Sequence, residues 1–298
     1  MISSVDLNKI FVQSLKSDLL MSKSITAAVL RIDELHPVIS GNKWFKLKYY
    51  LEDAVRKGFG TIVTFGGAYS NHIAATAFAC KEARLKSVGI IRGEEPANLS
   101  HTLQQASLDG MQLIFVSRND FKEEENIKAK FFSPDWYWIN TGGYGMNGAK
   151  GAAEIFNWID DSYTHILCAT GTGTMMAGLI KAAKKHQTVI GINSMKNKNL
   201  IDDIKNLLTI EELNKNFILL NEYHFGGFAK HPVELINFMK DVWQQYQLPT
   251  DIVYTSKLLF ATVDLIEKNY FEANSKLMII HSGGLQGNLS LPLNSLPF

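Results

Sequence analysis

Apolar and amphipathic segments alternate along nearly the whole chain, and this alternation predicts the class of fold. The apolar runs are short and rich in β-branched residues, which is typical of buried strands. They cover residues 26–33, 60–67, 86–93, 111–117, 164–173, 187–194 and 276–284. Segments with apolar residues at helical spacing lie between them, at 41–54, 70–83, 100–110 and 174–186. Strands separated by helices form right-handed βαβ units, so we expect an α/β fold with mostly parallel sheets.

Two segments interrupt this alternation. Residues 118–130 ("RNDFKEEENIKAK") are highly charged and are interpreted as a solvated helix face or loop. An aromatic cluster at 131–140 precedes a glycine-rich segment at 141–151. This shift of composition predicts a change of domain near residues 140–150.

The helix predicted after Gly41 begins in an unusual way. Asn42 is expected to cap it, and apolar residues follow at helical spacing, namely Trp44, Leu47, Leu51 and Val55. Lys43, Lys46 and Lys48 occupy its first two turns, where the helix dipole disfavours a cation by about 0.3–1 kcal/mol. Solvated lysines on an amphipathic helix are one interpretation. The other is that a lysine there is neutral because it forms an imine, or that it faces an anion.

Three predicted strands end in turns that could bind a ligand, because ligands of open α/β sheets gather at the carboxyl ends of the strands. In the first turn ("FGGAYSNH"), Gly66 and Gly67 permit close approach of the backbone, and Ser70 or Asn71 starts a helix. A helix start of this kind binds anions such as a carboxylate, and His72 follows directly. Ordinary capping would also explain Ser70 or Asn71.

The second turn ("CATGTGTMMAG") has the chemistry of a phosphate site. Its backbone N–H groups and hydroxyls form a tight nest before a helix, and they come from Thr170, Gly171, Thr172, Gly173 and Thr174. Gly-Lys-Ser/Thr does not follow, and Met176 occupies the third glycine position of a dinucleotide fingerprint. A single phosphate therefore fits better than a nucleotide.

The third turn ("IIHSGGLQGN") closes a strand with Ser282, Gly283 and Gly284. A core histidine, His281, followed by a glycine turn is the favoured interpretation here.

Lys43 and Lys46 are three residues apart, so they lie at neighbouring positions on one helix face. One lysine could form a Schiff base with an aldehyde while the other reaches a phosphate. Pyridoxal phosphate carries both groups and is the usual electron sink of amino-acid chemistry. It is therefore the cofactor that these lysines suggest.

Composition narrows the class of partner. The 298 residues are 46% hydrophobic and 20% charged, with a formal net charge of +1, so neither nucleic acid nor an anionic membrane is favoured. Cys80 and Cys168 both lie in apolar segments and are expected to be buried thiols. No export signal or long apolar span is recognised, and no metal site is expected. The cytoplasm is the expected location.

Six motifs, in order, resemble the 1-aminocyclopropane-1-carboxylate deaminase / D-cysteine desulfhydrase family of pyridoxal-phosphate enzymes. They are "SGNKWFKL", "FGGAYSNH", "GGYGMNGAKG", "CATGTGTMMAG", "DIVYTSK" and "IIHSGG". The resemblance implies the tryptophan-synthase-β-like fold (fold type II), with two open, mostly parallel twisted sheets flanked by helices. It also implies a large domain made of residues 1–45 and 146–298, a small domain of residues 46–145 inserted between them, and a homodimer.

The resemblance also implies roles for individual residues. Lys43 corresponds to the Schiff-base lysine, Ser70 binds the substrate carboxylate, and Tyr254 stacks on the pyridine ring; these are the expected catalytic residues. The remaining cofactor contacts are expected from Lys46, Asn71, Thr255, Ser282 and the turn Thr170, Gly171, Thr172, Gly173 and Thr174. Asn71 and His72 are expected to join Ser70 at the small amino-acid substrate.

Two positions bear on the reaction. The deaminases have an acidic residue near the pyridine nitrogen, whereas this chain has Thr255 there and offers Ser282 in the "HSGG" turn. Hydroxyls cannot hold a pyridinium as a carboxylate can, so the ring should be a weaker electron sink. This favours D-cysteine desulfhydrase-like β-elimination over opening of a cyclopropane.

Phe228 falls where the family usually has a second active-site tyrosine, and Tyr223 or His224 are candidate substitutes. The alternatives that stay open are cyclopropane deamination, racemisation, and a protein that binds pyridoxal phosphate without turnover.

Overall fold

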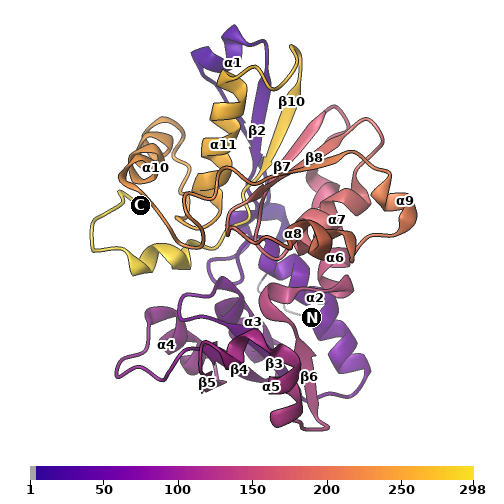
Figure 1. Ribbon diagram of the computed structural model, residues 1–298, viewed down its shortest axis with the longest axis vertical. Coiled ribbons are helices and arrows are strands. Elements are labelled where there is room, and N and C mark those ends of the chain that lie inside the picture. The colour runs from indigo at the N-terminus through magenta and orange to yellow at the C-terminus, as the bar shows by residue number, and fades with distance from the viewer. Residues whose placement is uncertain (1–4) are drawn as a thin grey trace.

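The larger of two sheets contains six strands in the spatial order β1-β2-β10-β7-β8-β9. Neighbouring strands run parallel, apart from the antiparallel pair β1 and β2. In the computed structural model, which describes residues 5–298, this sheet occupies the upper part of Figure 1. Its strands are β1 (Val12–Leu15), β2 (Thr26–Leu30), β7 (His165–Thr170), β8 (Thr188–Asn193), β9 (Phe217–Leu220) and β10 (Lys276–Ile280).

The smaller sheet has four strands, all parallel, in the order β5-β4-β3-β6, and occupies the lower part of Figure 1. They are β3 (Thr61–Gly66), β4 (Lys86–Arg92), β5 (Met111–Val116) and β6 (Trp136–Ile139). All four fall within the segment expected to form the small domain. The limits of that domain at residues 45 and 145 stay a prediction.

Helices flank both sheets (Figure 1). They are α1 (Asp18–Ser22), α2 (Asn42–Arg56), α3 (Asn71–Glu82), α4 (His101–Leu108), α5 (Glu124–Lys130), α6 (Met146–Ala153), α7 (Thr174–Ala182), α8 (Leu200–Lys205), α9 (Ile210–Leu213), α10 (Val233–Tyr246) and α11 (Thr255–Glu267). Within residues 5–298, none has both the length and the apolar character that crossing a bilayer requires.

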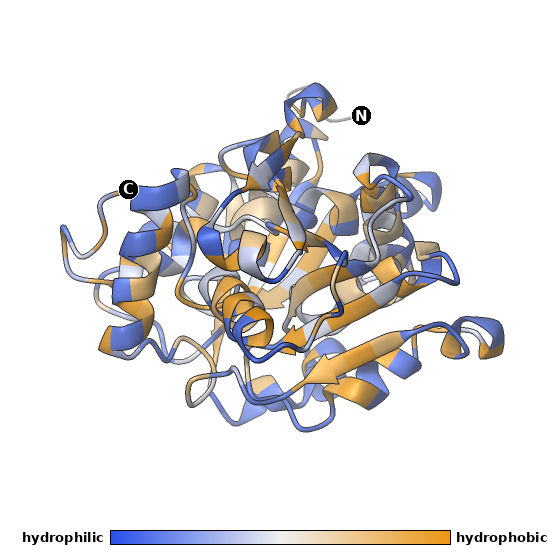
Figure 2. Cartoon of the chain, turned by 90° about the horizontal axis from the view of Figure 1, so that it is seen from above, coloured by the Kyte–Doolittle hydropathy of each residue, from blue (hydrophilic) through white to orange (hydrophobic). Residues whose placement is uncertain are grey.

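Side chains of β7 alternate between two apolar cores on opposite faces of the larger sheet. Ile166 and Cys168 belong to one core, and Leu167 and Ala169 belong to the other. A parallel strand covered on both faces is apolar at nearly every position, which explains the continuous apolar runs in the sequence. Figure 2 shows the same arrangement, with orange strands inside and blue residues on the outer helices.

Every strand predicted from the sequence coincides with an observed strand, and the mostly parallel arrangement is confirmed. The short strands β1, β6 and β9 were not predicted. Each has four residues, and β6 lies inside the aromatic cluster that indicated a change of domain. The charged segment 118–130 forms a 3-10 turn and the short helix α5, with Ile127 as the buried residue of α5.

Helix α2 buries Leu47 and Leu51 of the predicted apolar stripe but not Val55. Val55 is 58% exposed, and the buried apolar face consists of Phe45, Leu47, Tyr50, Leu51 and Ala54. The expectation for Val55 was therefore wrong. Helical spacing alone did not distinguish its position from that of Ala54, one residue earlier on the turn.

Helices α2, α6 and α7 pack at distances that only glycine allows. A Cβ atom added to Gly151 of α6 would lie 1.7 Å from the carbonyl oxygen of Phe45 in α2. A Cβ atom added to Gly178 of α7 would lie 2.5 Å from the carbonyl oxygen of Ala149 in α6. Because all these obstacles are backbone atoms, the three helices form one rigid layer. The layer fixes the start of α2 relative to the start of α7.

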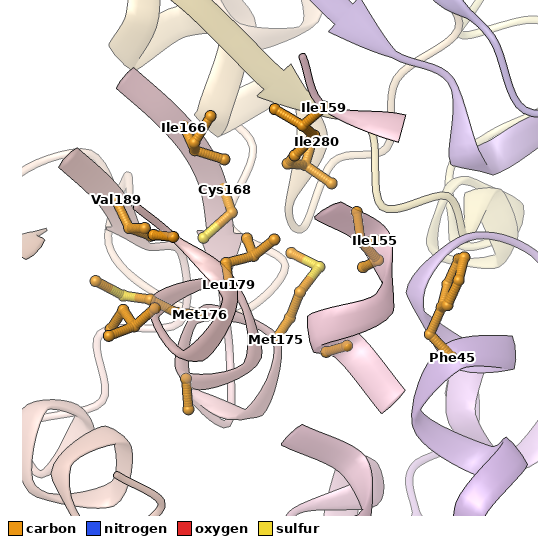
Figure 3. Close-up of a cluster of buried hydrophobic side chains, with 14 of the residues drawn as sticks. Phe45, Ile155, Ile159, Ile166, Cys168, Met175, Met176, Leu179, Val189 and Ile280 are labelled. Atoms are coloured by element: carbon orange, nitrogen blue, oxygen red, sulfur yellow. The ribbon is translucent and has the colours of Figure 1, made fainter. Parts of the chain in front are cut away.

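The same layer is anchored to the larger sheet by an apolar cluster. Figure 3 shows Phe45 of α2, Met175 of α7 and Ile166 and Cys168 of β7 within this cluster. Ile155, from the 3-10 helix that follows α6, lies between them. Residues far apart in the sequence thus hold α2 and α7 against β7.

Replacing Gly151 by alanine should destabilise the protein strongly. The new methyl group would meet the backbone of Phe45, and overpacking of this kind typically costs about 1–3 kcal/mol. Gly58→Ala is the control, because nothing lies within 4 Å of its added Cβ and only its φ of +79° is strained, at about 1–2 kcal/mol. Free energies of unfolding from urea titrations test this. A smaller loss for Gly151→Ala than for Gly58→Ala would contradict the rigid layer.

Candidate active site

A cavity of about 530 Å³ lies at the carboxyl ends of strands from both sheets. Its wall includes Gly66 at the end of β3, Arg92 at the end of β4 and Thr170 at the end of β7, together with Ser282, which follows β10. In parallel α/β sheets this edge is where ligands bind. The three turns singled out in the sequence therefore meet at one cavity.

Lys43 is positioned by a close contact between two loops. Gly41 precedes α2 with a φ of +60°, and a Cβ atom there would lie 1.9 Å from the carbonyl oxygen of Ser282. The backbone N–H of Asn42 donates to that same oxygen at 3.1 Å. The loop that carries Lys43 is thus held directly against the loop that carries Ser282.

Asn42 does not cap α2, contrary to the prediction. The N-cap residue is Gly41, and Asn42 is the first residue of the helix. The side-chain oxygen of Asn42 instead accepts a hydrogen bond from Nζ of Lys43 at 2.7 Å. The amide therefore orients the lysine rather than the helix backbone.

The two inner lysines are electrostatically unusual. Burial lowers the pKa of Lys43 to about 8, against a small opposing effect of Asp251. Burial and the neighbouring Lys43 lower the pKa of Lys46 well below its usual range, while Nζ of Lys46 donates to the carbonyl oxygen of Gly142 at 3.2 Å. Lys48 instead forms an ion pair with Glu154 at 2.8 Å and does not line the cavity.

The threonine-glycine turn lies in the wall of the same cavity. Thr170, Gly171, Thr172 and Gly173 line it, and α7 begins directly afterwards without a side-chain cap. The first-turn N–H groups of a helix without a cap favour an anion. Thr174 is fully buried and does not line the cavity, but its hydroxyl lies 3.1 Å from that of Thr172.

The start of α3 forms the opposite part of the wall. Ser70 is its N-cap residue, and its Oγ accepts a hydrogen bond from the backbone N–H of Ile73 at 3.3 Å. Nδ2 of Asn71 donates to the carbonyl oxygen of Gly284 at 3.0 Å. Oδ1 of Asn71 is buried and has no partner within residues 5–298. The α3 start thus combines a helix N-terminus with a free side-chain acceptor.

The hydrogen bonds of His72 show which of its two ring nitrogens carries the hydrogen and which is left as an acceptor. The hydroxyl of Thr64 donates to the carbonyl oxygen of Ile139 at 2.9 Å, so it accepts from Nε2 of His72, also at 2.9 Å. Nδ1 then carries no hydrogen, and it is buried without a partner in the described chain. Burial and the charges of Lys43 and Lys46 lower the pKa of His72, which keeps the ring neutral.

Tyr254 and Ser282 line the cavity, but Thr255 does not. The hydroxyl of Thr255 donates to Oδ1 of Asp251 and accepts from the backbone N–H of Asp251, each at 2.7 Å. This hydroxyl therefore both donates and accepts a hydrogen bond inside the protein. Contrary to the prediction, Thr255 does not line the cavity. Burial raises the pKa of Tyr254, whose hydroxyl lies 3.4 Å from Sδ of Met195.

His281 is a satisfied core histidine, as the favoured interpretation held. Its Nδ1 lies 3.1 Å from Oδ1 of Asp33, and its Nε2 lies 2.6 Å from the carbonyl oxygen of Pro249. Burial alone would lower the pKa of His281, but the Asp33 carboxylate outweighs burial and raises it. The pair holds the strand end that leads into Ser282.

Phe228 is 57% exposed and lines the cavity at its open side. Neither candidate substitute for the missing hydroxyl reaches the cavity. Tyr223 donates to Oδ2 of Asp264 at 2.6 Å, and Nδ1 of His224 accepts the backbone N–H of Gly226 at 2.8 Å. The side chain at this position of the wall is therefore apolar.

Lys257 is a buried cation that the sequence interpretation missed. Its Nζ donates to the carbonyl oxygens of Ser194 (3.0 Å), His224 (3.0 Å) and Gly227 (2.8 Å), and its side chain is fully buried. Burial lowers its pKa to about 8. Lys257 thereby ties the loop that carries Phe228 to α11. A lysine amid the buried apolar residues of α11 was the available signal.

Comparison with known proteins agrees with this geometry. The model of a family described as "Pyridoxal-phosphate dependent enzyme" matches residues 21–283. A protein of Pyrococcus abyssi named "Putative 1-aminocyclopropane-1-carboxylate deaminase" is 30% identical over 275 residues, which cover 84% of this chain and 81% of that protein. The "Bifunctional D-cysteine desulfhydrase/1-aminocyclopropane-1-carboxylate deaminase, mitochondrial" of Arabidopsis thaliana is 24% identical over 282 residues, covering 84% and 70%.

A solved structure described as an "ACC deaminase homologue" has a TM-score of 0.78 to this chain at 24% identity, and the match covers 96% of this chain and 92% of the other. The likeness therefore extends over the whole fold.

The buried Lys43 should make stability depend on pH when the protein is freed of any group bound to its amine. Its pKa is about 8 in the folded state against an ordinary value of 10.5. The unfolded chain then binds more protons between these values, so the free energy of unfolding should rise from pH 8 to pH 10.5.

Lys43→Met is the reference for this measurement, because it removes the titration and keeps the apolar stem. The free energy of unfolding of the wild type minus that of Lys43→Met should increase by up to about 3 kcal/mol over that pH interval. Denaturant titrations at successive pH values measure the difference. A difference that stays constant or falls would show that Lys43 is not buried as a cation.

Lys257→Met should loosen the loop at residues 224–228. Three carbonyl oxygens lose their donor in this variant, and the expected loss of stability is about 2–4 kcal/mol. Amide hydrogen exchange in the loop should accelerate more than in the core strands β3 and β7. Lys230→Met, an exposed change in the next turn, is the matched control. Equal exchange in both variants would rule out the anchoring role.

Proposed function

This chain belongs to the family of pyridoxal-phosphate-dependent enzymes, and from that premise we propose that it is a lyase acting on a small amino acid. The reaction is removal of the Cα proton followed by loss of the β-substituent, as in a D-cysteine desulfhydrase. Its two-sheet fold is the tryptophan-synthase-β-like fold, fold type II. The proposal includes a cytoplasmic homodimer, which rests on the family resemblance.

The residues of the cavity fit pyridoxal phosphate. Lys43 would supply an amine for the aldehyde, while Lys46 and the backbone N–H groups at the uncapped start of α7 would bind the phosphate. Three residues that line the cavity each have a buried polar atom without a partner within residues 5–298: Oδ1 of Asn71, Nδ1 of His72 and Oγ1 of Thr141. Buried polar groups are rarely left unpaired, so these atoms support a polar ligand in this place.

When bound, pyridoxal phosphate supplies an aldehyde for an amine and a ring that delocalises the electrons left at Cα. Lys43 would hold the aldehyde end, and Thr170, Gly171, Thr172 and Gly173 would surround the phosphate. Tyr254, which is half-buried in the wall, would cover the ring with its aromatic face. The remaining steps depend on side chains of this chain.

Lys43 is suited to move the Cα proton. A pKa of about 8 leaves part of the amines neutral near neutral pH, and only a neutral amine acts as a base. Asn42, whose oxygen accepts the hydrogen bond from Nζ, would keep this amine oriented. Ser70 and the first N–H groups of α3 would hold the substrate carboxylate, with the neutral His72 beside it.

The absence of acidic side chains from the cavity wall is the observation that carries the choice of reaction. Among the described residues, the lining includes Lys43, Lys46, Arg92 and Arg118 but neither aspartate nor glutamate. The wall then holds no carboxylate that would stabilise a pyridinium. Opening a cyclopropane demands more stabilisation at carbon than loss of a thiolate does, so the wall supports β-elimination.

The balanced reaction with D-cysteine consumes one water and yields pyruvate, ammonia and sulfide. Lys43 takes the proton from Cα, the electron pair of that bond forms the Cα–Cβ double bond, and the Cβ–S bond breaks with its pair on sulfur. Sulfide leaves as an anion, so an acidic side chain is not required to assist its departure. The cationic wall favours this step.

Opening of 1-aminocyclopropane-1-carboxylate is the second candidate function. The name of the relative from Pyrococcus abyssi favours it. The products separate the two, because the cyclopropane yields 2-oxobutanoate and D-cysteine yields pyruvate.

Replacing Lys43 by alanine should abolish both the visible absorbance of the purified protein and its turnover of D-cysteine. Lys48→Ala is the matched control, because Lys48 is on the same helix but pairs with Glu154 outside the cavity; it should retain both. Absorption spectra and keto-acid assays with D-cysteine and 1-aminocyclopropane-1-carboxylate provide the readout.

An unchanged spectrum in Lys43→Ala would remove the assignment of this lysine. Faster formation of 2-oxobutanoate than of pyruvate in wild type would establish the second candidate instead. Visible absorbance without any keto acid would leave a protein that binds the cofactor without turnover.

A further inference from the structure

Two arginines stand at the outer rim of the active-site cavity, on the smaller sheet. Arg92 is the last residue of β4, and Arg118 follows the end of β5 by two residues. Arg92 is paired in register with Val116, so Arg118, two residues further on, is expected on the same side of the sheet edge. A Cβ atom added to Gly93 would lie 4.0 Å from Nε of Arg118, which places that side chain beside the end of β4.

Neither guanidinium group has a partner inside the protein. Within residues 5–298, neither forms an ion pair with a carboxylate or a hydrogen bond through its side chain. Glu94 and Glu95 follow Arg92 in the sequence, but they are exposed and do not line the cavity. Two cations in a cavity wall without carboxylates attract anions.

The inner and the outer cations of the wall have different tasks. Lys43 and Lys46 lie at the start of α2 and would be engaged by the aldehyde and the phosphate. The α3 start, with Ser70, already provides for the α-carboxylate of a substrate. Arg92 and Arg118 therefore have no task in the proposed reaction of D-cysteine.

Two aromatic residues of the cavity wall lie close in the fold to the two arginines. Phe65 and Phe121 both line the cavity and meet edge to face, with ring centroids 6.1 Å apart. Phe65 is fully buried, so the half-buried Phe121 is the aromatic side chain that could contact the carbon or sulfur atoms of an extended substrate side chain. It offers no hydrogen-bonding group of its own.

The sheet geometry sets the length of that side chain. Adjacent strands lie about 4.8 Å apart, so β4 and β5 are about 5 Å and 10 Å from β3, whose turn leads to Ser70. An anion several bonds beyond Cβ would lie between the two guanidinium groups. Thiolate itself, directly on Cβ, is too close.

We propose that Arg92 and Arg118 form an anion subsite, and that the preferred substrates are β-substituted alanines whose leaving group carries a second negative charge, such as a carboxylate. The inference rests on the proposed β-elimination and extends it to a class of substrate. In the balanced step the Cα proton goes to Lys43 and the Cβ–S bond breaks. The leaving group departs as a thiolate that still bears its carboxylate, and water converts the remainder to pyruvate and ammonia.

Two isosteric substrates test the subsite. S-carboxymethylcysteine has the second charge, and S-carbamoylmethylcysteine replaces it by a neutral amide of nearly equal size; both are assayed as D- and L-enantiomers. In wild type, kcat/KM for the charged substrate should exceed that for the amide by about fivefold or more. The preference should appear mainly in KM and shrink at 1 M salt, where charges at the rim are screened.

Arg92→Gln and Arg118→Gln should each reduce this ratio, and the double variant should bring it close to one. Arg56→Gln is the control, because Arg56 pairs with Asp53 on the outer side of α2, and the ratio should remain that of wild type. A ratio near one in wild type, or an undiminished ratio in the double variant, would overturn the subsite.

A binding measurement separates this inference from the proposed reaction. Calorimetry on the holoenzyme compares glutarate with glutaramate, its mono-amide, and neither ligand reacts. Tighter binding of glutarate that is lost in the double variant would support the subsite even if no thioether were turned over. Turnover of D-cysteine together with equal binding of the two ligands would keep the lyase and dismiss the subsite.

Discussion

A buried lysine, Lys46, and a half-buried one, Lys43, in a cavity wall without carboxylates among the described residues are the constraint on which this molecule depends. Removing an ammonium group from water is costly, which lowers the pKa of both lysines, and repulsion by Lys43 lowers the pKa of Lys46 further. Folding tolerates the pair because α2, α6 and α7 are locked by backbone contacts at Gly151 and Gly178. In the proposed function, a dianionic phosphate and an aldehyde would relieve both costs at once, the phosphate by pairing with a cation and the aldehyde by removing a charge.

The electrostatics of the site are local and not a property of the whole chain. The formal net charge is only +1, yet the basic side chains of the cavity wall face no acidic ones among the described residues. Asp251 is the carboxylate near Lys43, but it accepts hydrogen bonds from the backbone N–H groups of Val253, Tyr254 and Thr255. It therefore caps the start of α11 and compensates Lys43 only weakly.

The sequence predicted those parts of the site whose determinants are local. The turns at Ser70 and at Thr170–Thr174 follow buried strands and precede helices, so their glycines and hydroxyls indicate a ligand site from the sequence alone. Lys257 could not be placed in this way, because the carbonyls that it binds are 30 to 63 residues away in the chain. Thr255 was misplaced for a different reason: its hydroxyl is bound by Asp251, only four residues earlier, and the residue types of the motif did not show that this carboxylate would satisfy it. Which nitrogen of His72 is the acceptor is likewise determined by Thr64 in β3 and Ile139 in β6, and the sequence around His72 does not show this contact.

The division between inner and outer cations has a consequence for how specificity can vary in this fold. Burial desolvates Lys43 and Lys46, so salt would screen their charges little, and in the proposed function a substitution of either would alter the covalent chemistry. Arg92 and Arg118 are exposed to solvent at the ends of β4 and β5, where loops tolerate substitution. Their contribution is weaker and screened, but it acts on the part of the substrate that differs between amino acids. If both proposals hold, the larger sheet and α2 would determine the reaction, while the edge of the smaller sheet would select the leaving group.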